Sequence, residues 1–359
     1  MAKKHPSSNY QRWLILLVMT FTFLGVLFVF DASVAESFNT FGDQYHFLKQ
    51  HSIWAVLGIT MMFLTSLVPI SIWEKLALPI FIAGLSLLIM VFIPGIGREL
   101  NGAHRWIFLG DIRLQPIESF KISLIIFFAS WLSKHQRTLP FVFITGLVSL
   151  LILLQPDLGS LLVMVIIAFG MFFIAGGNLL HILGISGVSI LFLAVAVLSS
   201  GYRKARLDTF FNPQADPLGS GFHIRQITLA LGRGGVTGQG IGNSRQKFSY
   251  IPEASTDSIF AIIAEEVGFV GSAVFILLFA TYFLNISKIA NHATNDFANL
   301  LGWGIVIWIA AQTLLNLAAV VALVPLTGLP LPFISYGGSS LVSILIANGI
   351  LLRIAKEYN

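Results

Sequence analysis

The chain has 359 residues, of which 56% are hydrophobic and only 10% are charged, and its formal net charge is +5. Soluble domains carry about 25% charged residues, so this composition excludes a mainly water-soluble fold and predicts an integral membrane protein with a single membrane domain. The sequence has no cysteine, which excludes disulfides, thiolate metal sites and cysteine nucleophiles.

Ten apolar stretches are suited to membrane-spanning helices, which need about 20 residues to cross the hydrocarbon core. The uncharged run after Arg137 is too long for one crossing, and we place breaks at Gln155–Pro156–Asp157 and at residues 176–178, because proline and glycine interrupt helices. We therefore predict an all-α polytopic fold, with tails at residues 1–12 and 354–359 around a membrane domain at 13–353. The predicted spans are residues 13–30, 52–69, 77–94, 116–133, 139–154, 158–175, 181–199, 257–284, 298–324 and 337–353.

Lysine and arginine in the short loops predict the orientation of the chain. Nine of these residues lie on the side of the termini and four on the other side, if the long polar loop at residues 201–256 is left out. Both termini are therefore expected in the cytoplasm and the long loop outside. This loop has a net charge of +4, which predicts an anionic partner, with attraction to anionic lipid headgroups as the alternative.

Asp257 lies where the polar loop gives way to an apolar run. A carboxylate beside a low-dielectric wall can have its proton affinity raised enough to act as a general base, so Asp257 is the candidate catalytic residue. The alternative is that Asp257 only favours a helix N-terminus electrostatically. Glu265 and Glu266 follow near the outer membrane boundary, where we expect them to pair with basic groups for structural reasons.

Other charged residues are candidates for substrate binding. Glu118 and Lys121 are three residues apart and can meet on one helix face; charges within a membrane are functional candidates by default, with a neutralised structural pair as the alternative. Arginine side chains match phosphate oxygens, so together they favour a phosphate-bearing ligand, although each alone could be a snorkelling anchor. The basic candidates are Arg98, Arg105, Arg203, Arg245 and Lys247, with Arg113 a further member of the arginine set.

Two glycine-rich segments complete the candidates. Residues 232–242 (GRGGVTGQGIG) lack the Walker lysine and the dinucleotide spacing, which leaves close backbone approach to a ligand or another loop. Residues 325–340 carry three prolines and a double glycine, and irregular backbone at this depth requires surrounding protein or a watery cavity. We expect a cavity wall that includes Ser335, Gly337 and Gly338, with inter-helix packing as the alternative. His223 is assigned no role.

Several of these segments resemble the SEDS family of shape, elongation, division and sporulation proteins (FtsW, RodA and SpoVE), and the resemblance covers nearly the whole chain. The segments are PLTGLPLPFISYGGSS at 325–340, NPQADPLGSG at 212–221, GQGIGNSRQKFSYIPEASTD at 238–257 and IFAIIAEEVG at 259–268, and NGAHRWIFLG and QPIESFK are similar to two further family elements. The Pro-Glu-Ala sequence before Asp257 is closer to FtsW than to RodA. Ser255 and Ser258 stand where relatives usually have histidine and an aromatic residue.

The resemblance implies an inverting glycosyltransferase that polymerises lipid II outside the cytoplasmic membrane, together with a class B penicillin-binding protein and other divisome or elongasome membrane proteins. The family's essential aspartate falls on Asp257, and its intramembrane glutamate and lysine fall on Glu118 and Lys121. We expect Asp257 to deprotonate the acceptor sugar, and the arginines, with or without a divalent cation (Mg²⁺ or Mn²⁺), to stabilise the diphosphate. A flippase for lipid-linked oligosaccharide and a non-catalytic scaffold for the penicillin-binding protein remain as alternatives. No nucleic acid is expected among the partners.

Overall fold

The computed structural model describes most of the chain. The described residues are 6–100, 103–110, 112–135, 137–178, 180, 181, 184, 187, 201–214, 221–248, 251 and 253–357. The predicted span at 181–199 lies outside the described residues except at positions 181, 184 and 187. The predicted total of ten spans therefore stays a prediction.

Within the described part, helices occupy the other nine predicted spans, and the all-α class is confirmed. These helices are α1 (Pro6–Phe41), α2 (His46–Thr65), α4 (Ala77–Met90), α5 (Pro116–Leu132), α6 (Thr138–Leu154), α7 (Leu158–Ile174), α11 (Ile259–His292), α12 (Asp296–Val320) and α13 (Gly338–Glu357). The short helix α3 (Ile70–Lys75) precedes α4. The helices α1 and α11 are longer than predicted, because α1 continues through polar residues at both of its ends and α11 continues through polar residues at its C-terminal end.

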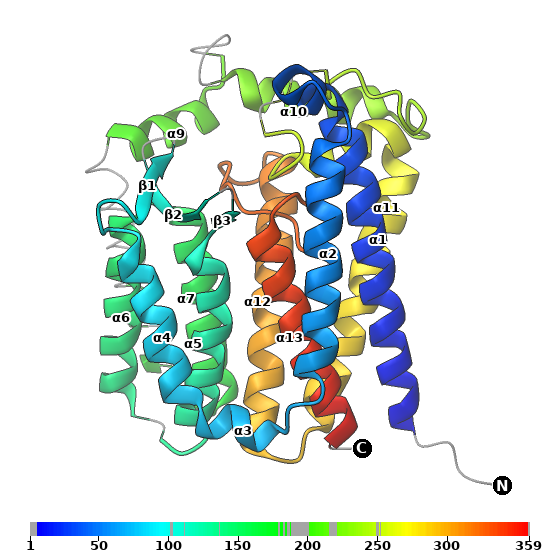
Figure 1. The fold of residues 1–359 in the computed structure, drawn as a ribbon. Helices are drawn as coiled ribbons and strands as arrows, with labels where there is room; N and C mark the ends of the chain where they lie inside the picture. Colours follow the sequence, from blue (N-terminus) through cyan, green and yellow to red (C-terminus); the bar gives the residue numbers. More distant parts are fainter. Residues whose placement is uncertain are drawn as a thin grey trace, which may run out of the picture.

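The long helices run side by side, and two shorter helices, α9 (Gly201–Phe211) and α10 (Phe222–Gly234), lie across one end, which we call the loop end (Figure 1). The first residues of α1 and the last of α13 lie at the opposite end (Figure 1). α12 and α13 are largely buried among their neighbours. Outer helices expose apolar stripes instead; on α6, Leu139 and Phe143 are 81% and 71% exposed. Such stripes are expected where lipid replaces water, so the chain is a multi-pass membrane protein.

A small antiparallel sheet covers part of the loop end, between α4 and α5. Its strands are β1 (Gly97–Leu100), β2 (Ala103–Leu109) and β3 (Ile112–Leu114), in the order β1-β2-β3, with Phe108 opposite Arg113. The sequence analysis predicted no strands here. The strands are too short for their alternation of apolar and polar residues to stand out from the surrounding apolar spans.

The predicted break at Gln155–Pro156–Asp157 is confirmed. Asp157 is the N-cap of α7, and its carboxylate accepts hydrogen bonds from the backbone N–H of Ser160 at 3.0 Å and from the Ser160 hydroxyl at 2.8 Å. These bonds satisfy one of the free N–H groups at the start of the helix.

The glycine-rich segment fills a break in α11. Gly268 has φ +67°, outside helical geometry, and the break frees the carbonyls of Glu265 and Glu266. These carbonyls accept hydrogen bonds from the backbone N–H groups of Gln239 and Gly240, each at 3.0 Å. Buried backbone groups must find such partners, so the expected close backbone approach is made to the chain itself.

Lys247 anchors the same loop to the helices through a buried ion network. Its amino group lies 2.7 Å from Asp31 of α1 and 3.2 Å from Glu266, and donates to the Gly242 carbonyl at 2.8 Å. The expected structural pairing of Glu266 with a basic group is thereby confirmed. Glu265 accepts instead from the hydroxyl of Ser244 at 2.5 Å. All three donors of the Lys247 ammonium are occupied by protein groups.

We expect Gly238→Ala to destabilise the protein more than Gly242→Ala. Both glycines are left-handed, with φ +82° and +83°, so alanine costs about 1–2 kcal/mol at either position. A Cβ at Gly238 would lie 2.1 Å from the Glu266 carbonyl oxygen, whereas at Gly242 it would meet no described atom within 4 Å. The clash should add about 1–3 kcal/mol. Thermal unfolding in detergent measures the difference, and equal losses would contradict this account.

Lys247→Met should destabilise the protein by about 3–5 kcal/mol, because it leaves the buried carboxylate of Glu266 and the half-buried carboxylate of Asp31 without their cation. Lys49→Met is the control: the Lys49–Asp43 pair has a similar distance of 2.8 Å, but the Lys49 side chain is 67% exposed. Exposed pairs contribute little to stability, so the unfolding temperature of this control should barely change. Comparable losses in the two variants would refute the anchoring role of Lys247.

Candidate functional site

Three consecutive backbone carbonyls hold the chain at Asp257. The Ser255 carbonyl accepts from the backbone N–H of Tyr336 at 2.8 Å, and the Thr256 carbonyl accepts from the Ser335 hydroxyl at 2.5 Å. The Asp257 carbonyl accepts from the amide of Asn316 on α12 at 2.8 Å. We call this arrangement the carbonyl clamp. It fixes the backbone of Asp257 just before α11 begins, so the direction of its side chain is set by parts distant in sequence.

Asp257 is partly exposed, and charged residues near it change the pKa of its carboxyl group. Burial by the surrounding protein, reinforced by the negative charge of Glu253, raises the pKa of Asp257 to about 7, against a smaller opposing effect of Arg206. The Thr256 hydroxyl lies 3.0 Å from Glu253 and 3.4 Å from the Asp257 carboxylate. The local chemistry is that of a carboxyl group that exchanges its proton near neutral pH.

Two residues near Asp257 in space, Glu253 and Gly328, have left-handed backbone conformations. Glu253 has φ +52°, an uncommon conformation for a residue with a side chain, and its carbonyl accepts the backbone N–H groups of Thr256 and Ser258. Gly328 has φ +68°, and a Cβ there would lie 4.0 Å from the Asp257 carboxylate. Strained backbone of this kind is found at sites that are held in place by their surroundings.

His223 of α10 has a partner in the residue next to Asp257. Its Nε2 lies 2.8 Å from the hydroxyl of Ser258. Burial, together with the positive charge of Arg206, lowers the pKa of His223 to about 4, so the ring is neutral at pH 7. Ser258 is one of the two positions at which this sequence differs from the residue usual in the family that it resembles. The small serine side chain leaves room for the contact with His223.

The candidates in the 325–340 segment support the site in different ways. Ser335 belongs to the carbonyl clamp, and its hydroxyl also accepts from the Leu331 N–H at 2.7 Å. Gly338 is a packing residue, because a Cβ would lie 2.4 Å from the Trp54 ring. A Cβ at Gly337 would make only ordinary contact, 3.7 Å from Ser340. Inter-helix packing is therefore the observed role of Gly338.

Glu118 and Lys121 form a buried ion pair on α5, as their spacing predicts. The amino group of Lys121 lies 2.7 Å from the Glu118 carboxylate, and the side chains are 0% and 1% exposed. The same amino group donates to the side-chain oxygen of Gln312 on α12 at 2.7 Å. The pair is sealed inside the protein and does not line an open surface.

The basic candidates whose side chains the structure describes do not converge on one point. Arg105 on β2 donates to the carbonyls of Gln155 (3.1 Å) and Pro156, and so holds the turn between α6 and α7. Arg113 is exposed and lies over the Phe108 ring, and Arg245 is exposed on the long loop. Lys247 is occupied in its ion network. The side chains of the two remaining candidates, Arg98 and Arg203, lie outside the described part.

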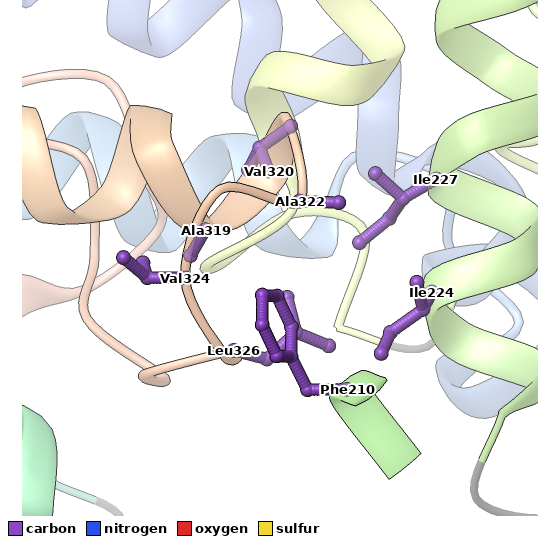
Figure 2. A pocket seen from close by; sticks show the side chains of 8 residues that line it. All are labelled: Phe210, Ile224, Ile227, Ala319, Val320, Ala322, Val324 and Leu326. Carbon is purple, nitrogen blue, oxygen red and sulfur yellow. The ribbon is translucent and has the colours of Figure 1, made fainter. Parts of the chain in front are cut away.

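A small apolar cleft opens at the loop end, next to the segment that carries Gly328. Figure 2 shows Phe210 of α9, Ile224 and Ile227 of α10, and Leu326 facing one another across it. The cleft and the open solvent at its mouth together have a volume of about 210 Å³. The carbonyl of Leu326 accepts from Arg206 at 3.3 Å, which joins the cleft to the charges around Asp257.

The divalent cation expected from the sequence has no protein-built cage in the described ranges. No three His, Asp or Glu side chains converge there in a metal-binding arrangement. Glu253 and Asp257 are two carboxylates, whereas Ca²⁺ or Mg²⁺ sites formed by protein alone need more oxygen ligands. The divalent cation therefore stays a prediction.

Sequence reasoning missed four contributors to the surroundings of Asp257. Arg206 and His223 are distant from Asp257 in sequence, and no pattern linked the nearby Glu253 to it. Asn316 lies within an apolar span. The signal for Asn316 was present, because an amide in a membrane helix needs a buried partner. The other three follow only from how α9, α10 and the turn before α11 pack together.

The chain is similar over nearly its whole length to one family of known proteins. A family model described as a cell cycle protein, of the FtsW, RodA and SpoVE type, matches residues 11–359. The chain is 38% identical to the probable peptidoglycan glycosyltransferase FtsW of Coxiella burnetii, with 99% of each chain covered. It is 37% identical to the stage V sporulation protein E of Bacillus subtilis, with 96% of each covered.

Solved structures resemble the fold over nearly its full length. A chain from a peptidoglycan synthase complex, described as coordinating polymerization and crosslinking, has a TM-score of 0.78 and 28% identity, with 96% of this chain and 97% of that chain covered. The rod shape determining protein RodA of Thermus thermophilus has a TM-score of 0.71 and 28% identity, with 96% of each chain covered. With a family model that matches almost every residue and relatives above one-third identity, the chain belongs to the FtsW/RodA/SpoVE family of cell cycle proteins.

Proposed function

We propose that the protein is a peptidoglycan glycosyltransferase that polymerises lipid II into β-1,4 glycan strands at the outer face of the cytoplasmic membrane. The observation that carries the proposal is Asp257: a clamped, partly exposed carboxyl with a pKa of about 7 at the loop end. A general base acts best when its pKa lies near the working pH. The printed names of the relatives, which include peptidoglycan glycosyltransferases, support the same reaction class.

In the proposed step, the Asp257 carboxylate takes the proton from the 4-hydroxyl of the acceptor sugar. The hydroxyl oxygen forms a bond to the anomeric carbon of the donor from the face opposite the diphosphate. The bond between that carbon and the diphosphate oxygen breaks, and the diphosphate leaves with the electron pair, so the configuration inverts. The exposed cations Arg113 and Arg245 at the loop end are the proposed contacts of the leaving group.

The location of the site supports an extracytoplasmic reaction. The positive-inside count favours cytoplasmic termini, and α9 and α10 lie at the other end of the bundle (Figure 1). Asp257 lies beside α10, because His223 of that helix contacts the neighbouring Ser258. The small apolar cleft lies at the same end. A class B penicillin-binding protein and other divisome or elongasome membrane proteins are the proposed partners. One structural neighbour comes from a complex described as combining polymerization with crosslinking.

Asp257→Asn should abolish polymer formation, because the amide has nearly the same shape but cannot take a proton. General-base catalysis contributes about 10²- to 10⁴-fold, so the residual rate should fall by at least two orders of magnitude. The assay is lipid II polymerisation by the purified protein with its penicillin-binding partner. Glu74→Gln is the control, since Glu74 lies on α3 at the opposite end of the bundle and pairs with the exposed Lys134 (Figure 1).

Full activity of the Asp257→Asn variant would overturn the assignment. Translocation of lipid-linked oligosaccharide in vesicles, without chain growth by the wild type, would favour the flippase. Activity that depends only on the partner, with wild type and variant equivalent, would favour the scaffold.

The acid limb of the pH–rate profile should move in opposite directions in two charge variants. The proposed base is active when deprotonated, so the rate rises with pH through about 7. Glu253 raises the pKa of Asp257, so Glu253→Gln should shift the midpoint to lower pH. Arg206 lowers that pKa, so Arg206→Gln should shift the midpoint to higher pH. Initial rates measured from about pH 5 to about pH 9 test this. Shifts of the same sign in both variants would contradict it.

A further inference from the structure

Hydrogen bonds from α12 link the buried ion pair of α5 and the clamped Asp257 to the same two residues, Leu329 and Pro330. Gln312 and Asn316 are four residues apart, so they lie on the same face of α12, and they are 0% and 2% exposed. Gln312 contacts Lys121 on one side and the 325–340 segment on the other. Asn316 contacts that segment and Asp257.

The chemistry of the partners fixes the orientation of both amides. The side-chain oxygen of Gln312 accepts from Lys121 at 2.7 Å and from the Trp308 ring N–H at 2.9 Å, and both of these groups can only donate. Its NH₂ group must therefore point to the Pro330 carbonyl, 2.9 Å away. A flipped amide would place donors against donors.

Asn316 is fixed in the same way. Its NH₂ group donates to the carbonyls of Leu329 and Asp257, each at 2.8 Å, and both carbonyls can only accept. Gln312 and Asn316 thus hold two successive carbonyls, those of Pro330 and Leu329, and Asn316 supplies the last bond of the carbonyl clamp. Lys121 is thus connected to Asp257 through Gln312, the Leu329–Pro330 backbone and Asn316.

We propose that Gln312 and Asn316 are positioning residues for Asp257, and that the Glu118–Lys121 pair acts on the reaction through them rather than by binding substrate. This inference rests on the proposed function for its kinetic consequences. A displacement of a catalytic group by about 1 Å can cost about 10²-fold in rate. Loss of the amide contacts should therefore lower kcat and leave KM nearly unchanged, because the groups that contact substrate stay in place.

The test compares Asn316→Leu with Asn348→Leu in the purified full-length protein. Asn348 on α13 is a matched control: it is 0% exposed and makes two side-chain hydrogen bonds, to Tyr282 and to the Ile344 carbonyl, but no described contact to the site. We expect similar falls in unfolding temperature in both variants. Only Asn316→Leu should lower kcat, by about 10- to 100-fold, with KM changed less than about twofold.

A second readout reports on Asp257 without requiring activity. Carbodiimide coupling of an amine to exposed carboxyls, read by mass spectrometry, should show faster modification of Asp257 in Asn316→Leu than in the wild type or in Asn348→Leu. If the wild type does not polymerise lipid II, the proposed function fails, while this measurement still decides whether Asn316 positions Asp257.

The role of the ion pair is tested by the double variant Glu118→Gln, Lys121→Met. Replacing both partners leaves no unpaired buried charge, so the fold should survive. We expect lower kcat, unchanged KM and faster modification of Asp257; a raised KM with unchanged kcat would show direct substrate binding and overturn the inference. Equal kcat and equal Asp257 modification in Asn316→Leu and Asn348→Leu would also overturn it. If Asn316→Leu does not fold, Gln312→Met, which removes the amide contacts to Lys121 and Pro330 without adding a charge, decides by the same criteria.

Discussion

The structure depends on a requirement of the lipid environment: each backbone polar group that leaves regular helix needs a partner supplied by the protein. At Asp257 this requirement is met three times in succession, because the carbonyls of residues 255, 256 and 257 are bonded to Tyr336, Ser335 and Asn316. These donors come from α12 and from the segment before α13. The acid is therefore held by backbone contacts from the centre of the bundle, while its carboxyl remains partly exposed at the loop end.

The same requirement explains how the polar loop is attached. The break at Gly268 frees two carbonyls, and the glycine-rich segment supplies their donors, which is possible only where side chains do not keep the two backbones apart. Lys247 adds an ion network that reaches α1. Two kinds of contact thus join an extramembrane segment to the membrane helices. One depends on backbone proximity and the other on buried charge.

Much of the fold could be predicted from the sequence, because apolar length and helix-breaking residues are local signals. The spans outside 181–199, the break capped by Asp157 and the pairing of Glu118 with Lys121 all followed from residues close in sequence. The sheet did not, since its strands are short and flanked by equally apolar spans. Asp257 could be singled out as a candidate, but Arg206 and His223 could not be linked to it. Their proximity arises from tertiary packing of α9 and α10.

The break in α11 also divides this helix into two parts with different constraints. The part after Gly268 crosses the lipid, whereas the short part from Ile259 to Val267 is fixed by the carbonyl clamp at its start and by the glycine-rich segment at its end. Each added or removed residue turns a helix by about 100°. Residues 259–266 are all buried, so packing constrains their side chains. An insertion or deletion would in addition break the carbonyl clamp or pull the glycine contacts apart. Both the composition and the length of this part are therefore constrained.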